Sequence, residues 1–145
     1  MSKKNKKPHQ VNYYSLINGG VAVLPNAVLE NYRYLKLTPC AKVLLNYLAA
    51  QYRGYNNGDL CATLSILRKK GFNSQDTITR SIKMLEEQEL IVRTKQGGKH
   101  YRTGQNLPNL YAIAWQPIDE CGGKLDVMPT IKPHINFLAE YKNVA

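Results

Sequence analysis

Apolar residues recur every three or four positions over residues 38–54, the spacing that places side chains on one face of a helix. Thr38 suits the residue that caps a helix start, Pro39 suits the first helical position, and Gly54 suits a helix end. The apolar positions are Ala41, Leu44, Leu45, Leu48 and Tyr52. We therefore predict a helix here that lies in the core.

Shorter patterned segments stand on either side of this helix. The segment before it predicts a short helix that begins at Pro25 or Asn26. The residues of this short helix that are available to the core are Ala27, Leu29, Tyr32 and Leu35. After the long helix, Asn57 and Gly58 are typical of a tight turn, and residues 59–62 are expected to pair as a short strand.

A second helical pattern begins at Thr63 and is divided by a glycine. Thr63 suits the cap of a helix of about two turns, and Gly71 suits its left-handed end. A longer helix, Gln75–Gln88, is expected to follow, capped by Asn73 or Ser74. Its apolar face consists of Ile78, Ile82 and Leu85. Two helices joined by a tight turn that contains glycine are typical of a helix-turn-helix.

The pattern then changes from helical to alternating. Residues 90–95 and 110–115 predict two strands, and the polar, glycine-rich residues between them predict a long basic loop. The positions expected on the helix-facing side of the second strand are Tyr111, Ile113 and Trp115. A last apolar segment, residues 134–143, predicts one more short helix.

These patterns occur together in LCATLSILRKKGFNSQDTITRSIKMLEEQELIVRT, preceded by LTPCAKVLLNYLAAQYRGYNNGD. The segment resembles the winged helix-turn-helix domains of bacterial, phage and plasmid proteins of replication and regulation, over about residues 24–117. It departs from that pattern in the turn GFNS, which has one residue more between Gly71 and the capping Ser74. The resemblance implies a winged helix-turn-helix fold and binding to DNA.

The predicted elements define a mainly α fold with a small β-hairpin, an α+β class, which the resemblance specifies as a winged helix-turn-helix. With 145 residues, the chain is long enough for one full-sized core. Three parts are expected: a basic, disordered arm over residues 1–20, the winged helix-turn-helix domain over 21–117, and a C-terminal tail with a short helix over 118–145.

Positive charge is concentrated in the first two thirds of the chain. The formal net charge is +10 in total; residues 1–102 hold 17 Lys and Arg against six Asp and Glu, whereas residues 103–145 hold three against four. This asymmetry is typical of a protein that binds a polyanion, with nucleic acid the first candidate and an anionic membrane surface the second. The alternative is a basic surface that only aids solubility.

The expected helix Gln75–Gln88 is about 20 Å long, and the DNA major groove, about 12 Å wide, accepts such a helix side-on. Arg80 has the planar fork that pairs with guanine, and Gln75 has the amide that pairs with adenine. Hydroxyl groups near the helix start suit phosphates. The candidate DNA-binding residues of this helix are Ser74, Gln75, Asp76, Thr77, Thr79, Arg80 and Lys83.

Two basic groups flank this helix and are expected to hold phosphates. The first is Arg68, Lys69 and Lys70, and the second is the loop group Lys95, Lys99, His100, Tyr101 and Arg102, which also has the minor groove in reach. A structural alternative exists for the helix cations, because exposed cations such as Arg80 and Lys83 often pair with acids along a helix, here Glu86 or Glu87.

Several chemistries have no support in the sequence. Cys40, Cys61 and Cys121 are far apart, and the three histidines are scattered, so we expect no metal and no cofactor. The motifs of nucleophilic and phosphate-binding enzymes are absent from the sequence, so we expect no catalysis; a DNA-cutting tyrosine is the one enzymatic alternative. No apolar run approaches the length of a membrane span, and the first residues do not form a secretory signal.

The expected partner is double-stranded DNA, with no small-molecule ligand and no membrane, in the cytoplasm and at the nucleoid when bound. A homodimer is an option, because two reading helices spaced by one helical turn are common. The tail face Ile135, Leu138 and Tyr141 would either form that contact or fold back on the domain. The alternative function is a winged-helix module that binds another protein, for which the basic loop would have no use.

Overall fold

The computed structural model of the chain describes residues 17–144, so most of the expected basic arm, 1–20, lies outside the described residues. The fold is α+β. Its α-helices are α2 (Asn26–Leu29), α3 (Tyr32–Leu35), α4 (Pro39–Gln51), α5 (Leu64–Leu67), α6 (Gln75–Glu87) and α7 (Phe137–Val144). Its strands are β1 (Ile91–Lys95), β2 (Gly98–Lys99), β3 (Asn106–Leu107) and β4 (Leu110–Ile113), and short 3-10 turns are η1 (Arg68–Lys70) and η2 (Cys121–Gly123).

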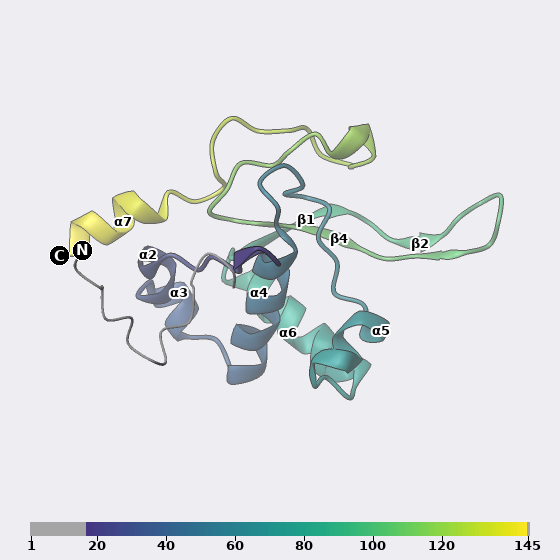
Figure 1. Cartoon of the computed structure of the whole chain (residues 1–145), viewed down its shortest axis with the longest axis horizontal. Helices are drawn as coiled ribbons and strands as arrows, with labels where there is room; N and C mark the ends of the chain where they lie inside the picture. Colours follow the sequence, from purple (N-terminus) through teal and green to yellow (C-terminus); the bar gives the residue numbers. More distant parts are fainter. Residues whose placement is uncertain (1–16, 145) are drawn as a thin grey trace, which may run out of the picture.

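A long β-hairpin, residues 91–113, crosses the molecule and projects beyond it (Figure 1). Helices α4 and α6 lie on one side of the hairpin root, and the segment that follows β4 passes on the other side (Figure 1). At the root, β1 and β4 are antiparallel, with Ile91 opposite Ile113 and Arg93 opposite Tyr111. The predicted strand over 59–62 is reduced to one bridge, between Leu60 and Tyr111.

Helix α4 begins at the predicted cap but ends at a different group from the one predicted. The Thr38 hydroxyl accepts from the backbone N–H of Ala41 at 3.3 Å, and Pro39 is the first helical residue. Of the predicted stripe, Ala41, Leu44, Leu45 and Leu48 are buried, whereas Tyr52 follows the last helical residue and is partly buried. The helix ends at Gln51, whose carbonyl accepts from the Asn56 side chain at 2.9 Å, so a side chain rather than Gly54 closes it.

The helix expected from Pro25 or Asn26 is divided into α2 and α3 by Asn31. Asn31 has an extended backbone, and its side chain accepts from the N–H of Arg33 at 3.0 Å, which starts a new helix there. The prediction that Tyr32 and Leu35 belong to the core is wrong, because the restart turns them outward, 54% and 62% exposed. The buried apolar residues of this region are Val28 and Leu37.

Helices α5 and α6 are joined through η1 and a tight turn. Gly71 ends η1 with a φ of +97°, a left-handed conformation that suits glycine. Phe72, in the turn, is buried and donates its N–H to the carbonyl of Leu67 at 3.1 Å. Ser74 then caps α6 by accepting from the N–H of Thr77 at 3.5 Å. The longer turn GFNS therefore places an additional apolar side chain in the core.

The core lies between α4, α6 and the hairpin root. On α6, Ile78, Ile82 and Leu85 are buried as predicted, and they pack with the buried residues of α4. Tyr111 and Ile113 of β4 are buried in the same cluster, with Trp115 packed beside it, as the alternation predicts. Every residue of β4 is buried, because helices cover one face and the segment that follows β4 covers the other.

Asn57 joins the turn after α4 to the end of β4 and to the segment that follows it. Its side-chain N–H groups donate to the carbonyls of Ile113, Gln116 and Pro117 at 3.1, 3.0 and 2.9 Å, and its side-chain oxygen accepts from the N–H of Ile113 at 2.8 Å. The Asn57 backbone exchanges hydrogen bonds with Asp119. Asn57 is fully buried, so one side chain satisfies four backbone groups away from water.

The C-terminal segment folds back on the body of the protein. Phe137 of α7 is 3% exposed and meets the ring of Trp115 edge-on, with centroids 6.4 Å apart. Helix α7 contacts α2. The Glu140 carboxylate accepts from Arg33 at 2.7 and 2.9 Å and from the Asn31 side chain at 2.6 Å. Leu138 and Tyr141 are exposed, so the buried anchor of this helix is Phe137.

Replacing Asn57 with Ala is expected to lower the free energy of unfolding by about 2–4 kcal/mol, because buried backbone groups lose their partners. Urea unfolding followed by circular dichroism measures this difference. The matched control is Asn73→Ala at an exposed position, expected to stay within about 0.5 kcal/mol of the wild type. A loss as small as the control's would contradict the role given to Asn57.

Stability should depend on pH through Glu140. Burial alone would raise the pKa of Glu140, but the hydrogen bonds from Arg33 and Asn31 outweigh burial and hold that pKa below its usual range. A lowered folded-state pKa stabilises the fold fully above about pH 4.3 and loses this contribution as pH falls through the folded-state pKa. Because Glu140 is partly exposed, the contribution is about 0.5–1 kcal/mol.

The variant Glu140→Gln should therefore be less stable than the wild type at pH 7, and this difference should be smaller at pH 3. Urea unfolding at both pH values measures the two differences, with the exposed Glu120→Gln as the charge-matched control. Equal differences at the two pH values would show that the ionised Glu140 does not stabilise the fold.

Candidate functional site

The outer face of α6 is what remains after its apolar stripe is buried. Gln75, Asp76, Thr79, Arg80 and Lys83 are all exposed on this helix. Thr77 is half-buried and lines a different hollow, with Cys40, Val43 and Phe72. The structure thus brings most of the predicted helix residues onto the outer face, whereas Ser74, which is also half-buried, and Thr77 lie on the flank toward α4.

Both cations of this face are paired with acids of the same helix. Arg80 lies 3.1 Å from the Asp76 carboxylate, and Lys83 lies 3.9 Å from the Glu87 carboxylate. The structural alternative is therefore realised for Lys83, while Arg80 pairs with Asp76 instead of Glu86 or Glu87. All four side chains are more than 60% exposed, and exposed pairs of this kind contribute only about 0–1 kcal/mol. An external anion can replace either acid at small cost.

Gln75 and Thr79 form a second pair on the same face. The side-chain amide N–H of Gln75 donates to the Thr79 hydroxyl at 3.2 Å. That hydroxyl donates to the backbone carbonyl of Gln75 at 2.9 Å. The carbonyl oxygen of the Gln75 side chain is an acceptor on the exposed surface. These contacts orient the amide along the helix while leaving it accessible.

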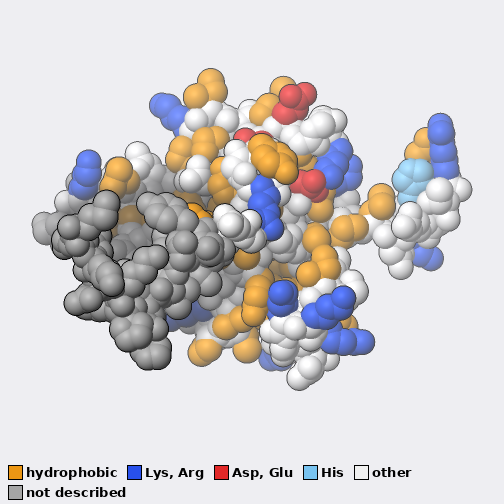
Figure 2. Space-filling view, viewed as in Figure 1, with side chains coloured by type: hydrophobic (Ala, Val, Ile, Leu, Met, Phe, Trp, Pro, Cys, Tyr) orange, Lys and Arg blue, Asp and Glu red, His pale blue; other side chains and the backbone are white. Residues whose placement is uncertain are grey.

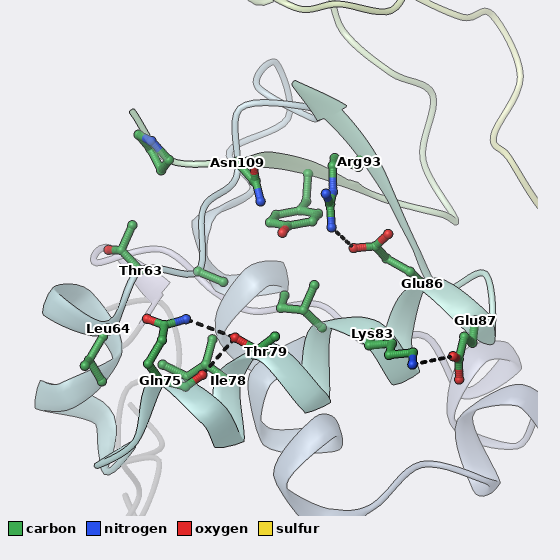
Figure 3. A pocket seen from close by; sticks show the side chains of 14 residues that line it. Thr63, Leu64, Gln75, Ile78, Thr79, Lys83, Glu86, Glu87, Arg93 and Asn109 are labelled. Atoms are coloured by element: carbon green, nitrogen blue, oxygen red, sulfur yellow. Dashed lines mark hydrogen bonds and ion pairs between the residues drawn. The ribbon is translucent and has the colours of Figure 1, made fainter. Parts of the chain in front are cut away.

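A groove of about 660 Å³ separates this face of α6 from the hairpin root. Gln75, Thr79 and Lys83 form its helix wall, and Arg93 and Asn109 form its hairpin wall (Figure 3). The remaining lining residues are Ala62, Thr63, Leu64, Ile78, Ile82, Glu86, Glu87, Pro108 and Tyr111. The groove is therefore polar on both walls, with apolar side chains between them.

Arg93 is fixed at the root of the hairpin. Its guanidinium donates to the Glu86 carboxylate at 2.8 Å and lies 5.8 Å from the centre of the Tyr111 ring (Figure 3). The hydrogen bond to Glu86 raises the pKa of Arg93, and burial raises the pKa of Tyr111. Arg93 is thus charged but neutralised within the protein, which makes it a structural tie between α6 and β1.

The tip of the hairpin carries four of the predicted loop residues. The rings of His100 and Tyr101 stack with centroids 5.2 Å apart, and the Arg102 guanidinium lies 5.3 Å from the centre of the Tyr101 ring. His100 accepts from the backbone N–H of Arg102 at 3.3 Å, which shapes the turn. Tyr101 is 83% exposed, and Lys99 is exposed beside it. The tip is therefore a small cationic and aromatic surface held away from the body.

Lys95 does not join this tip. Its ammonium group donates to the carbonyl of Lys124 at 2.5 Å, on the segment that covers the other side of the hairpin. The η1 group, in contrast, is fully available: Arg68, Lys69 and Lys70 are exposed, with the Lys70 ammonium 5.6 Å from the centre of the Tyr47 ring. In the space-filling view, basic side chains gather at the hairpin tip and around α5 (Figure 2).

Sequence reasoning missed Arg93, Asn109 and Thr63 as lining residues of the groove. Arg93 lies in a predicted strand, where alternation indicates the face of the sheet on which a side chain lies. It does not indicate which residue that side chain will contact. Asn109 is a polar residue between a proline and an apolar strand. This position was the one indication in the sequence that its side chain has a specific contact. Thr63 lies at the predicted cap position of α5, where its hydroxyl contacts Ser65 at 3.1 Å rather than a backbone N–H.

Within residues 17–144, no three His, Cys, Asp or Glu side chains cluster as metal ligands would. No helix in this part of the chain combines the length and the apolar character that crossing a membrane requires. Comparison with known proteins found no matching family model, no similar curated protein and no similar solved structure. The chemistry of the exposed surfaces is therefore the basis for a functional proposal.

Proposed function

We propose that this protein binds double-stranded DNA and that its helices and hairpin form a winged helix-turn-helix. Helices α5 and α6 would be the helix-turn-helix, β1 and β4 would begin the wing, and the bridge at Leu60 would be what remains of a third strand. Helix α4 would be the scaffold on which α6 lies. The order of these elements along the chain supports this proposal.

The observation that carries the proposal is the chemistry of the α6 outer face together with its two basic neighbours. Thirteen helical residues span about 20 Å, a length that fits the major groove side-on. The η1 group precedes this helix directly, and the hairpin tip projects beyond it. A duplex on the α6 face would therefore meet cations on its flanking phosphates.

The side chains suggest a division of roles. Arg80 and Gln75 would read base edges, because a guanidinium fork suits guanine and an amide suits adenine. Ser74, Thr77 and Thr79 would contact phosphates near the helix start. The phosphate contacts on either side would come from Arg68, Lys69, Lys70, Lys99 and Arg102.

A sequence-reading protein of this kind would serve as a transcription regulator or as an origin-binding part of a replication system, in the cytoplasm and at the nucleoid. One helix reads only a few base pairs, so a dimer with its two reading helices about 34 Å apart would extend the site. The exposed Leu138 and Tyr141 of α7 are available for such a contact.

Binding to random duplex DNA should weaken steeply as salt increases. If about five or six phosphates are neutralised, the logarithm of the association constant should fall against the logarithm of salt concentration with a slope near −5. Fluorescence anisotropy of a labelled duplex at several salt concentrations measures this slope. A slope near zero would reject DNA binding and favour the alternative, a winged-helix module that binds another protein.

Arg80→Ala should cost about 1–3 kcal/mol on a selected site and relax its base preference, whereas Lys99→Ala should weaken all sequences alike. Selection of bound fragments from a random pool supplies the site, and anisotropy on the site and on a scrambled duplex measures both effects. Lys36→Ala, at the C-cap of α3, removes the same charge and should change little; helix α3 lies on the side of the molecule opposite the projecting end of the hairpin (Figure 1). Identical behaviour of Arg80→Ala and Lys99→Ala would refute the division into base-reading and phosphate-holding residues.

A further inference from the structure

The hairpin consists of two separate ladders with an unpaired step between them. β1 pairs with β4 at the root, β2 pairs with β3 in the outer half, and residues 96–97 and 108–109 belong to neither ladder. Pro108 has no N–H to donate, and a Cβ at Gly97 would collide with the backbone of Leu107 and Pro108. Ladder hydrogen bonds therefore do not join the outer half of the hairpin to its root at this step, which we call the hinge.

Side chains take the place of the missing ladder at this hinge. The N–H of Gly97 donates to the Asn109 side chain at 2.6 Å, within the hairpin itself. The N–H of Gln96 donates to the Asp126 carboxylate at 3.0 Å. Of these two acceptors, Asp126 belongs to a different part of the chain, so its bond ties the hinge to the body.

Asp126 lies in a loop, residues 118–130, whose two ends are joined. The N–H of Thr130 donates to the carbonyl of Ile118, and the N–H of Ile118 donates to the Thr130 hydroxyl, both at 2.9 Å. The N–H of Asp126 donates to the carbonyl of Thr94 at 2.8 Å, beside the irregularity between Arg93 and Lys95 in β1. The closed loop thus meets β1 where the register of the ladder is irregular.

Two further contacts fix this loop to the turn after α4. The Lys124 ammonium lies 2.7 Å from the Asp59 carboxylate, and the Leu125 side chain fills the space beside Gly58. The turn itself is held to the loop by the hydrogen bonds between Asn57 and Asp119. The loop is therefore a bracket between the α4 turn and the hairpin hinge.

We propose that the loop 118–130 sets the direction of the hairpin tip and that Asp126 is its positioning residue. This inference rests on the proposed DNA binding, because the tip charges, Lys99 and Arg102, matter only if they meet phosphates. Without the Gln96–Asp126 hydrogen bond, the outer half would turn about the hinge and its two cations would leave the duplex. The salt slope should then decrease in magnitude by about two units, close to 0.9 for each lost phosphate contact.

A pair of variants separates the hydrogen bond from the charge. Asp126→Ala and Asp126→Asn remove the same negative charge, but only Asn keeps a side-chain oxygen that can accept from Gln96. Charge removal alone should strengthen binding to a polyanion. We therefore expect Asp126→Asn to bind random duplex at least as tightly as the wild type, and Asp126→Ala to bind more weakly with the smaller slope. Equal binding and slopes for the two variants would overturn the inference.

A double-mutant cycle tests the link to the tip. The double variant Lys99→Gln, Arg102→Gln should weaken binding in the wild-type background and change little when Asp126→Ala is also present. Additive losses, or no loss from the tip variant alone, would reject the positioning role even when the wild type binds DNA with a steep salt slope. A wild-type slope near zero would instead reject the proposed function itself.

Hydrogen exchange gives a readout without DNA. The amide of Gln96 should exchange faster in Asp126→Ala than in Asp126→Asn, while the amide of Ile113, bonded to Asn57, should exchange alike in both. Unchanged exchange at Gln96 in Asp126→Ala would contradict the hydrogen bond on which the inference depends. Asp126 is exposed, so either variant keeps the core intact.

Discussion

The burial of one apolar stripe, Ile78, Ile82 and Leu85, determines which face of α6 meets the surroundings. Burying three such side chains contributes roughly 5–9 kcal/mol, at about 1.5–3 kcal/mol each. The exposed ion pairs on the opposite face contribute at most about 1 kcal/mol apiece. The helix therefore keeps its rotation on α4 when the partners of its outer side chains change. In the proposed complex, Arg80 would exchange the Asp76 carboxylate for a base edge, on a surface that is already in place.

The elements that the sequence predicts well are those specified by nearby residues. The cap at Thr38, the left-handed Gly71 and the stripe of α6 each act within one or two helical turns, and the structure confirms them. The split between α2 and α3 also has a local cause, but it depends on how one side chain is used. Asn31 is of a residue type that is favoured at helix caps, but the sequence pattern predicts one helix across it; in the structure it caps α3, and Tyr32 and Leu35 lie at the surface.

The features that the sequence does not predict are pairings between distant residues. Asn57 suggested only a tight turn, yet its side chain holds the end of β4, 56 residues later. The sequence predicts a long basic loop between the two strands but gives no partners for its backbone; in the structure, Asp126 and Asn109 accept from the N–H groups of Gln96 and Gly97. Lys95 counted as a loop cation, whereas its ammonium group is bonded to the carbonyl of Lys124. The pattern of apolar and polar positions indicates on which face of a helix or strand a side chain lies. Which residue it contacts there depends on how distant parts of the chain are brought together.

Charge divides the groove between α6 and the hairpin into two ends. At the hairpin root, Glu86 pairs with Arg93 and Glu87 pairs with Lys83. The charges of this end of the groove cancel, so it has no net attraction for phosphate. Outside the groove, the η1 group before α6 and the hairpin tip carry exposed cations. A duplex would therefore approach the first two turns of α6 and the tip, and avoid the root. Since the tip lies beyond a hinge, the second of these contacts depends on the direction of the outer hairpin, which helix packing does not set. In the proposed complex, core packing would seat the reading helix, whereas the wing would need a separate contact to set its direction, and the loop that contains Asp126 is bonded to the hairpin at the hinge.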